Sequence, residues 1–450
     1  RLNHPTIRPA GDHVTIRFDG QPIPALAGET IAAALSAAGI VAFRRTATGA
    51  PRGLHCGMGA CFDCVVTVDG RIGQRACMTT VADGIVVTGA EPEQPSPLIR
   101  SADVAEPETR TCDVLVIGAG PAGLSAAIAA AAAGAAVIVL DERTAPGGQY
   151  AKRLAPSHAD TAPDAQFRLG AELHRRAASA GARLEAEATV WGAFGPGEIA
   201  ALVRGRAVTY APRRLILAPG AHERPVPLPG WTLPGVMTTG ALQTLVRTQR
   251  VCPGTRVLIA GNGPLNLQLA CEMLACGIKP VAVVEAAAKP GPAALVAAWH
   301  MLRASSDLAR EGLGMIARLR LARVPIVWHS QITALEGNGR VHHARLADRV
   351  IEADVVAINL GFQPEVGLAR ALGLRHRFID TGIGYLATET DEDGRCTADA
   401  PSAAGDRSTV FAVGDGAILG GSRVAMARGR LAGLAAARDL GFTAPDDAEA

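Results

Sequence analysis

The sequence predicts an α/β fold in which a small α+β domain precedes two tandem domains, each built on a parallel sheet. Three observations predict it. A β-branched strand, a glycine turn and a helix follow one another from Asp113, and the same pattern returns from Arg256. Ahead of both, alternating apolar and polar residues surround a group of closely spaced cysteines. A chain of 450 residues also exceeds what one hydrophobic core usually organises.

Composition argues against two broad classes of function. The formal net charge is +2 and no basic stripe gathers along the chain, so no nucleic-acid partner is expected. Residues 114–140 carry no charge, but glycines and a proline divide them into a strand, a turn, an Ala-rich helix and a second strand. No membrane span is therefore expected. The N-terminus shows neither a secretory nor a transit pattern, so a cytoplasmic location is expected.

Residues 1–90 predict the small α+β domain. Residues 13–25 alternate around an Asp-Gly turn, which is typical of a hairpin, and Thr30 is placed to cap the helix that follows. Residues 91–110 are rich in Glu, Pro and Ser and predict a linker.

Four cysteines in this domain predict a [2Fe-2S] cluster. Cys56, Cys61 and Cys64 follow the x4 and x2 spacing of plant-type ferredoxins, and Cys77 comes twelve residues later. Gly57, Gly59 and Ala60, between the first two cysteines, are small, as a loop that wraps a cluster requires. Structural zinc would favour two separated Cys-x2-Cys pairs. The other five cysteines form no such pair and are interpreted as packing residues.

The first glycine turn predicts an FAD site. Gly118 permits the turn, Gly120 lets a pyrophosphate approach the backbone, and Gly123 allows the helix to pack on the strand. The helix N-terminus supplies positive potential, and Asp141 closes the next strand, where it can accept the adenosine ribose hydroxyls.

Three further segments resemble flavin-binding loops of the thioredoxin-reductase-like superfamily: residues 146–149, 215–220 and 410–415. They favour FAD over NAD, and the resemblance implies that Asp415 lies at the ribityl-pyrophosphate region. The residues predicted to bind FAD are Gly118, Gly120, Pro121, Ala122, Gly123, Asp141, Glu142, Gly148, Gln149, Ala218, Gly220, Gly414 and Asp415.

The second glycine turn predicts another nucleotide site, at Gly261, Gly263 and Glu285, the acidic residue that ends the next strand. Asn266 replaces the usual third glycine. A carboxylate at residue 285 would disfavour NADP by repelling its 2′-phosphate. Whether NAD or ATP occupies this site stays open.

The second pattern interrupts the first domain, because residues 410–415 resemble the returning half of an FAD domain. The predicted order is a first FAD-binding segment at 111–230, an NAD-type domain at 231–350, and a second FAD-binding segment at 351–450. This is the architecture of a two-dinucleotide-binding-domain flavoprotein with FAD- and NAD-type Rossmann-like domains.

Residues 220–240 and 261–268 resemble a narrower group: the FAD-containing α or A subunit of heteromeric amine and imino-acid dehydrogenases. This group includes opine oxidase, hydrogen cyanide synthase, sarcosine oxidase and the proline and hydroxyproline dehydrogenases. Residues 10–90 resemble the ferredoxin-like β-grasp domain of the same systems. His222 and Glu223, within the matching segment, are interpreted as structural.

The resemblance implies an electron-transfer subunit whose partner β subunit oxidises a secondary amine or imino acid at its own FAD. No catalytic residue for that oxidation is evident in this chain. Electrons would pass from the partner's flavin, with an FMN at the subunit interface in some relatives, to [2Fe-2S], FAD and an acceptor. Small additional subunits belong to the same expectation.

Two other functions stay open. One is an NADH-dependent FAD/[2Fe-2S] reductase, in which electrons enter at the second nucleotide domain. The other is a nucleotide-stabilised assembly scaffold, against which the complete set of four cysteines argues.

Overall fold

The structure is a computed structural model that describes residues 1–90, 107–291, 299, 303, 305–382, 384–397 and 409–443. These residues form two compact units. Unit 1 comprises residues 1–98, 154–162 and 223–361; unit 2 comprises residues 99–153, 163–222 and 362–450. The chain passes from unit 2 into unit 1 within β16 (Ala221–Glu223) and returns before β25 (Phe362–Pro364).

The N-terminal region of unit 1 is a five-stranded mixed sheet with one helix, α1 (Ile31–Ala37), packed on it. The sheet order is β3-β2-β8-β6-β7. Its strands are β2 (His13–Phe18), β3 (Gln21–Leu26), β6 (Val65–Val68), β7 (Arg71–Arg75) and β8 (Val86–Thr88). The predicted hairpin and cap are confirmed: β2 pairs antiparallel with β3, and the Thr30 hydroxyl accepts from the Ala33 amide at 3.2 Å.

Two small antiparallel pairs complete this region. They are β1 (Ile7–Pro9) with β11 (His158–Asp160) and β4 (Arg44–Arg45) with β5 (Pro51–Arg52). Residues 91–106 of the predicted linker lie outside the described residues of the chain, and the last residues of that linker already belong to β9, which begins at Glu108.

The rest of unit 1 is built on a second five-stranded sheet, whose strands are all parallel, in the order β17-β24-β18-β19-β20. The strands are β17 (Val236–Thr238), β18 (Val257–Gly261), β19 (Ala282–Glu285), β20 (Ile326–Trp328) and β24 (Val355–Asn359). The helices are α4 (Thr239–Gln243), the π-helix η2 (Thr244–Thr248), α5 (Pro264–Ala275) and α7 (Ser306–Leu321). Strand β24 belongs to this sheet although it lies beyond residue 350, where the sequence analysis ends the NAD-type domain. Only its pairing with β17 and β18 assigns it to the sheet, and the sequence pattern does not show that pairing.

An antiparallel sheet of three short strands adjoins the parallel one. Its strands are β21 (Ala334–Glu336), β22 (His343–Arg345) and β23 (Val350–Glu352). Their apolar side chains, such as Leu335 and Ala344, join the cluster formed by one face of the parallel sheet.

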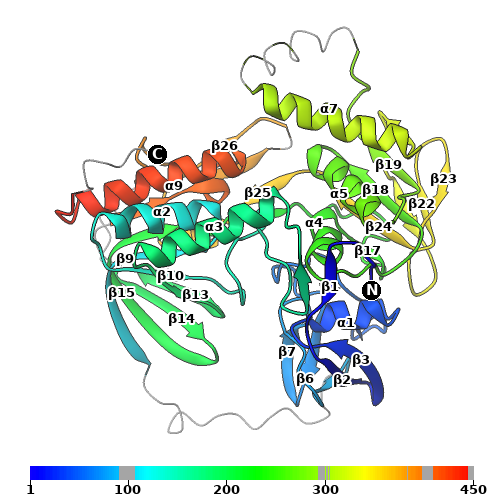
Figure 1. The fold of residues 1–450 in the computed structure, drawn as a ribbon, viewed down its shortest axis with the longest axis horizontal. Helices are drawn as coiled ribbons and strands as arrows, with labels where there is room; N and C mark the ends of the chain where they lie inside the picture. Colours follow the sequence, from blue (N-terminus) through cyan, green and yellow to red (C-terminus); the bar gives the residue numbers. More distant parts are fainter. Residues whose placement is uncertain are drawn as a thin grey trace. The chain divides into compact units, whose positions relative to one another are not determined.

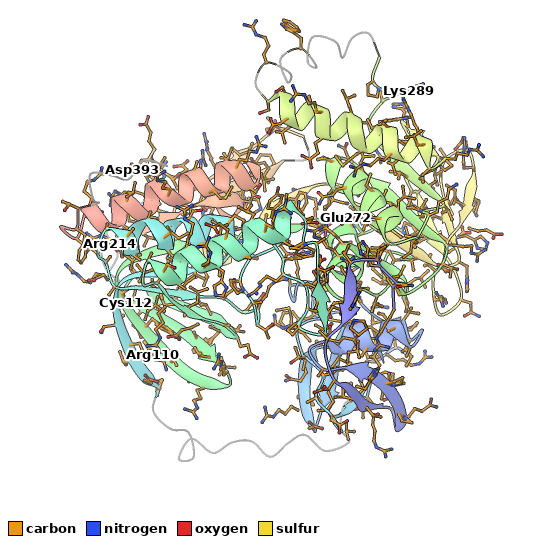
Figure 2. The ribbon with its side chains drawn as sticks, in the orientation of Figure 1. Arg110, Cys112, Arg214, Glu272, Lys289 and Asp393 are labelled. Atoms are coloured by element: carbon orange, nitrogen blue, oxygen red, sulfur yellow. The ribbon has the colours of Figure 1, made fainter. Side chains whose placement is uncertain are left out.

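Unit 2 is built on a seven-stranded sheet in the order β12-β10-β9-β15-β14-β13, with β28 also paired to β15. The strands are β9 (Glu108–Ile117), β10 (Val137–Leu140), β12 (Arg183–Glu185), β13 (Ala188–Gly195), β14 (Glu198–Val203), β15 (Arg206–Leu217) and β28 (Val410–Ala412). On β9, Arg110 (Figure 2) donates to the buried carboxylate of Glu185 at 2.7 Å, and the Tyr210 hydroxyl donates to the same oxygen. These bonds tie β9 to strands on either side of it.

Small residues let the helices of unit 2 approach closely. The helices are α2 (Pro121–Ala132), α3 (Ala165–Ser179), α8 (Gly367–Ala371), the 3-10 turn η5 (Gly414–Gly416) and α9 (Gly421–Arg438). A Cβ on Gly429 or Gly433 of α9 would come within 2.2 Å of a carbonyl oxygen of α2, so the two helices lie in backbone contact (Figure 1). A hairpin of β26 (His376–Ile379) and β27 (Tyr385–Thr388) completes the unit.

Among the described residues, no helix has both the length and the apolar composition that crossing a bilayer requires.

Candidate functional site

The four predicted ligand cysteines form two thiol pairs: Cys56, Cys61 and Cys64 lie in the loop between β5 and β6, and Cys77 lies just after β7. The Cys56 and Cys61 side chains hydrogen-bond to each other, and Cys64 pairs with Cys77 in the same way. Cys56, Cys64 and Cys77 are buried, whereas Cys61 is exposed. One of the four predicted ligands therefore lies at the surface and three lie inside.

In each pair, one thiol has a lowered pKa. The hydrogen bond with Cys61 lowers the pKa of Cys56 to about 5, and the bond with Cys77 lowers the pKa of Cys64. The same bonds raise the pKa of Cys61 and of Cys77. The thiolate is the form that binds metal, so the lowered pKa of Cys56 and of Cys64 agrees with their predicted role as ligands.

The backbone of the loop also favours negatively charged sulfur. The Cys61 amide donates to the Cys56 sulfur at 3.4 Å, and the Asp63 amide lies 3.5 Å from the Cys61 sulfur. Gly57 and Gly59 have positive φ values of 62° and 82°, which turn the loop back on itself. Amide-to-sulfur bonds of this kind are among the factors that set a cluster's reduction potential.

The donor set, four thiols in two pairs, fits a [2Fe-2S] cluster. Within the described residues, no group of three or more His, Cys, Asp or Glu side chains is arranged to hold one metal ion. A [2Fe-2S] cluster needs no common centre, because each of its two irons takes two thiolates beside the bridging sulfides. Two neighbouring pairs meet that need, as the cysteine spacing predicts.

The cluster loop packs on the parallel-sheet region of unit 1. The Thr238 amide donates to the His55 carbonyl at 2.9 Å, and a Cβ on Gly57 would come within 2.8 Å of the Ala241 Cα. The His55 ring meets Trp231 edge-on, with 5.2 Å between ring centroids, and burial lowers its pKa. The loop is thus fixed to the residues around β17 and α4.

The first glycine turn has the geometry of a dinucleotide site. Gly118 has a φ of 103°, and a Cβ on it would lie 2.2 Å from the Ala218 carbonyl oxygen. A Cβ on Gly123 would lie 1.9 Å from the Gly118 oxygen, whereas the nearest atom to one on Gly120 is 3.7 Å away. The middle glycine therefore borders open space, as an approaching pyrophosphate needs.

Asp141 closes the turn. Its Oδ2 accepts from the Ala119 amide at 2.7 Å and its Oδ1 from the Arg143 amide at 2.9 Å, and burial raises its pKa. The carboxylate stands at the end of β10, beside the glycine turn, in the place predicted for a ribose contact.

The flanking segments converge on the same turn. A Cβ on Gly148 would lie 2.8 Å from the Gly120 Cα, and one on Gly414 would lie 2.7 Å from the Ala122 Cβ. Residues 148, 218 and 414, far apart in sequence, thus meet at the start of α2. The Asp415 Oδ1 accepts from the Gly420 and Gly421 amides at 2.8 and 3.0 Å, which caps α9. Glu142 follows Asp141 after the end of β10, and Gln149 follows Gly148. Gly220 has no atom within 4 Å of its Cβ position.

The second glycine turn, at the end of β18, repeats this geometry. Gly261 has a φ of 137°, and a Cβ on it would lie 1.7 Å from the Asn359 carbonyl oxygen. Gly263 has a φ of 110° and no atom within 4 Å of its Cβ position. The buried Glu285 carboxylate receives the Gly263 amide at 3.4 Å and the Ala287 amide at 3.1 Å.

Asn266, in the third-glycine position, is held by two hydrogen bonds. It is fully buried, its Oδ1 accepts from the Thr239 hydroxyl at 2.8 Å, and its Nδ2 donates to the Asn359 carbonyl at 3.4 Å. Asn359 has no role in the sequence prediction. Only its position at the end of β24, next to β18, brings it to the turn.

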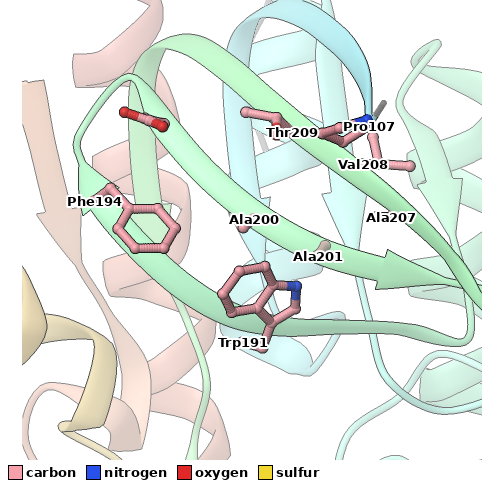
Figure 3. Close-up of a pocket in the computed structure, with 9 residues that line it drawn as sticks. Pro107, Trp191, Phe194, Ala200, Ala201, Ala207, Val208 and Thr209 are labelled. Carbon is pink, nitrogen blue, oxygen red and sulfur yellow. The ribbon is translucent and has the colours of Figure 1, made fainter. Parts of the chain in front are cut away.

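Unit 2 also contains a cavity of about 160 Å³ on its antiparallel strands, flanked by Trp191 and Phe194 (Figure 3). These two rings are exposed and meet edge-on at 5.8 Å. None of the residues predicted to bind FAD lines this cavity.

Two family models match the chain. The 2Fe-2S iron-sulfur cluster binding domain matches residues 11–92, and the pyridine nucleotide-disulphide oxidoreductase family matches residues 112–438. The second match covers more than half of the chain. The predicted fold class, a 2Fe-2S domain followed by FAD- and NAD-type domains, is confirmed.

Several characterised proteins are similar over most of the chain. The A subunit of opine oxidase from Agrobacterium tumefaciens is 33% identical over 361 residues, which are 76% of this chain and 68% of that protein. The HcnB subunit of hydrogen cyanide synthase from Pseudomonas aeruginosa is 32% identical over 350 residues, 74% of this chain and 72% of that protein. The alpha subunit of sarcosine oxidase from Rhizobium meliloti is 29% identical over 427 residues, but the match covers only 40% of that protein.

Among solved structures, L-proline dehydrogenase from P. horikoshii matches 98% of this chain and 77% of its own, with a TM-score of 0.72 and 19% identity. Thioredoxin reductase from T. acidophilum matches 74% of this chain and 99% of its own, with a TM-score of 0.52 and 20% identity. At these identities the likeness concerns the fold. The chain therefore belongs to the pyridine nucleotide-disulphide oxidoreductase family, in the group that contains the opine oxidase A subunit and HcnB, and it is an FAD-dependent oxidoreductase with an N-terminal 2Fe-2S domain.

Proposed function

We propose that this chain is the electron-transfer subunit of a heteromeric dehydrogenase or oxidase that acts on the CH–NH bond of a secondary amine or imino acid. The substrate would be of the opine, proline, hydroxyproline or sarcosine type. Its oxidation would take place on an FAD-containing β subunit, in the cytoplasm, with small additional subunits in the complex.

The observation that carries the proposal is the presence of two kinds of electron-carrier site in one chain. Two cysteine pairs, Cys56 with Cys61 and Cys64 with Cys77, stand in the same polypeptide as the glycine turn at Gly118. The names of the relatives, which are subunits of opine oxidase, hydrogen cyanide synthase and sarcosine oxidase, support a partner-dependent reaction.

Each site would hold its cofactor with identifiable residues. The four cysteines would ligate the [2Fe-2S] cluster, and amides such as that of Cys61 would stabilise the charge on its sulfurs. The glycine turn and the N-terminus of α2 would receive the FAD pyrophosphate, and Asp141 the adenosine ribose. When bound, the two cofactors supply electron-transfer chemistry, and the protein sets their potentials and access.

The second nucleotide site belongs to the same proposal. Gly261, Gly263 and Glu285 would hold an adenine nucleotide, NAD or ATP, through the same turn geometry. An FMN at the interface with the β subunit would complete the set of carriers.

Visible and EPR spectra of the purified chain, taken as isolated, after NADH and after dithionite, test the proposal. We expect a flavin and a [2Fe-2S] signal that dithionite reduces and NADH does not, because electrons enter from the partner subunit. Rapid bleaching by NADH alone would refute this direction of electron entry and identify an NADH-dependent reductase. A chain without a reducible cluster would instead favour the assembly scaffold.

A further inference from the structure

Two buried hydrogen-bond routes leave the second glycine turn and meet at α4. The first runs through Asn266, in the first turn of α5. Its Oδ1 accepts from the hydroxyl of Thr239, the first residue of α4, at 2.8 Å. The Asn266 side chain therefore joins α4 to the first turn of α5, the turn that would face a bound diphosphate. A glycine at this position would make no such bond.

The second route runs through Asn359 and Glu223. The Asn262 amide of the turn donates to the Asn359 carbonyl at 2.7 Å, and the Asn359 side-chain amide donates to the Glu223 Oε1 at 2.6 Å. The other carboxylate oxygen of Glu223 accepts from the Gly240 amide, in α4, at 2.8 Å. Both carboxylate oxygens are thus engaged between the turn and α4.

Helix α4 is in turn attached to the cluster loop. The Thr238 amide, at its N-cap, donates to the His55 carbonyl, next to the ligand Cys56. Gly57, on the other side of that ligand, lies against Ala241 of α4, within 2.8 Å of where its Cβ would be. A shift of α4 therefore reaches both neighbours of Cys56.

The polar groups on these routes are buried. The side chains of Asn266 and Thr239 belong to fully buried residues, Asn359 is 1% exposed and Glu223 is 5% exposed. An unpaired polar group at such positions costs free energy. A displacement of the turn should therefore move the bonded groups with it and keep their hydrogen bonds intact. Outside the two routes, the bond between the Gly263 amide and Glu285 is also long, at 3.4 Å, so a ligand at the turn can replace it at little cost.

We propose that occupancy of the second glycine turn by an adenosine diphosphate group changes the reduction potential of the [2Fe-2S] cluster through the Asn266–Thr239 and Asn359–Glu223 routes. This inference rests on the proposed function, since it needs both the cluster and a nucleotide at the second site. A displacement of α4 changes the packing and the amide contacts around Cys56, which are among the factors that set a cluster's reduction potential. Reciprocally, the oxidation state of the cluster changes the affinity for ADP by the same factor.

A redox titration of the FAD-loaded full chain, with the cluster followed by its EPR signal, tests this. The probe is ADP, which is redox-inactive and carries both the ribose and the diphosphate. We expect about a tenfold difference in ADP affinity between the two cluster states, a typical coupling. For a one-electron couple this corresponds to a change in the cluster's reduction potential of about 59 mV on addition of saturating ADP.

Three variants assign the shift to the network. Asn266→Gly restores the usual third glycine and removes the bond to Thr239, and Thr239→Val removes the same bond from the other side with little change of shape. Asn338→Gly is the matched control, because Asn338 is exposed in a loop outside the network. Iron and FAD contents equal to those of the wild type identify folded variants, and two independent substitutions guard against one that fails to fold.

The expected result is a shift that is present in the wild type and Asn338→Gly, and at least halved in Asn266→Gly and Thr239→Val while calorimetry still detects ADP binding. A wild-type chain that binds ADP without a shift, or that binds no ADP, overturns the inference. So does a full shift in both network variants, because the Asn266–Thr239 bond would then carry none of it. The absence of any cluster EPR signal after dithionite overturns the proposed function as well, and is recognised before ADP is added.

Discussion

Gly57 of the cluster loop lies against Ala241 of α4, so closely that a Cβ on Gly57 would approach the Ala241 Cα to 2.8 Å. Gly57 also has a φ of 62°, in the left-handed region that other residues adopt at a cost. Both the lack of room for a Cβ and the backbone conformation therefore favour glycine at residue 57, beside the predicted ligand Cys56. The contact fixes the cluster loop to the region of unit 1 that carries the second glycine turn.

The substitution Gly57→Ala should loosen the cluster loop. The methyl group must displace α4 or the loop, and overpacking of this kind costs about 1–3 kcal/mol beyond the left-handed strain. We expect lower iron and sulfide contents per chain and a lower unfolding temperature of the domain. Iron analysis and thermal unfolding followed by circular dichroism measure both.

Gly70→Ala is the matched control for that substitution. Gly70 lies in the turn between β6 and β7 with a φ of 77°, and no atom lies within 4 Å of its Cβ position. It carries the backbone strain without the clash. Equal iron loss in the two variants would show that the contact with α4 does not matter to the cluster.

Cys61→Ser should abolish the [2Fe-2S] signal and leave FAD in place. Cys61 is the exposed ligand of the four, so its loss disturbs packing least while it leaves one iron a thiolate short. Cys271→Ser, which changes a half-buried cysteine on α5, is the control. EPR after dithionite and the flavin absorbance of the same samples separate the two effects. An unchanged cluster spectrum in Cys61→Ser would remove Cys61 from the ligand set.

Much of this arrangement is local and could be predicted from the sequence. The hairpin at residues 13–25 and the Thr30 cap depend on alternation and on one side-chain bond, and both are present. The two glycine turns were recognisable because each sits between a strand and a helix, with an acidic residue at the end of the next strand. In patterns of this kind, residues close together in the sequence determine the local backbone geometry, so the sequence alone predicts it.

The rest depends on pairings between distant segments, which periodicity does not encode. Asn359 reaches the second turn only because β24 pairs with β18 across nearly a hundred residues. The contact of Gly57 with Ala241 likewise requires the loop to meet α4. Asn266 was visible as a departure from the glycine pattern, but its partner Thr239 was not, since no sequence signal links the two helices.

Asp141→Asn should weaken FAD binding without affecting the cluster. The amide keeps the shape of the side chain but loses the charge that a ribose hydroxyl would meet, and a hydrogen bond to a charged group contributes about 1.5–3 kcal/mol. We therefore expect FAD affinity to fall at least about tenfold. Fluorescence titration of the FAD-depleted chain measures it.

Asp113→Asn supplies the control for the flavin site. The Asp113 Oδ2 also accepts from a backbone amide, that of Ala136 at 2.9 Å, but outside the glycine turn. Its substitution should leave FAD affinity within about twofold of the wild type, because the hydrogen-bond partners of the Asp113 side chain, Ala136 and Arg213, lie outside the glycine turn. Equal losses in both variants would point to a general destabilisation of the sheet in place of a ribose contact.

Arg75→Met should shorten the lifetime of the cluster in air. The Arg75 Nη1 donates to the Gly59 carbonyl at 3.0 Å, and its guanidinium lies 5.3 Å from the centroid of the exposed Phe62 ring. Arg75 thus contacts the loop on both sides of the predicted ligand Cys61 and restrains it. Loss of the hydrogen bond and the cation–π contact together removes about 1–2 kcal/mol. If local opening limits oxidative loss, the decay of the cluster absorbance should accelerate about fivefold or more. Arg71→Met, on the exposed start of β7, should decay at the wild-type rate, and equal decay in both variants would mean that Arg75 does not restrain the loop.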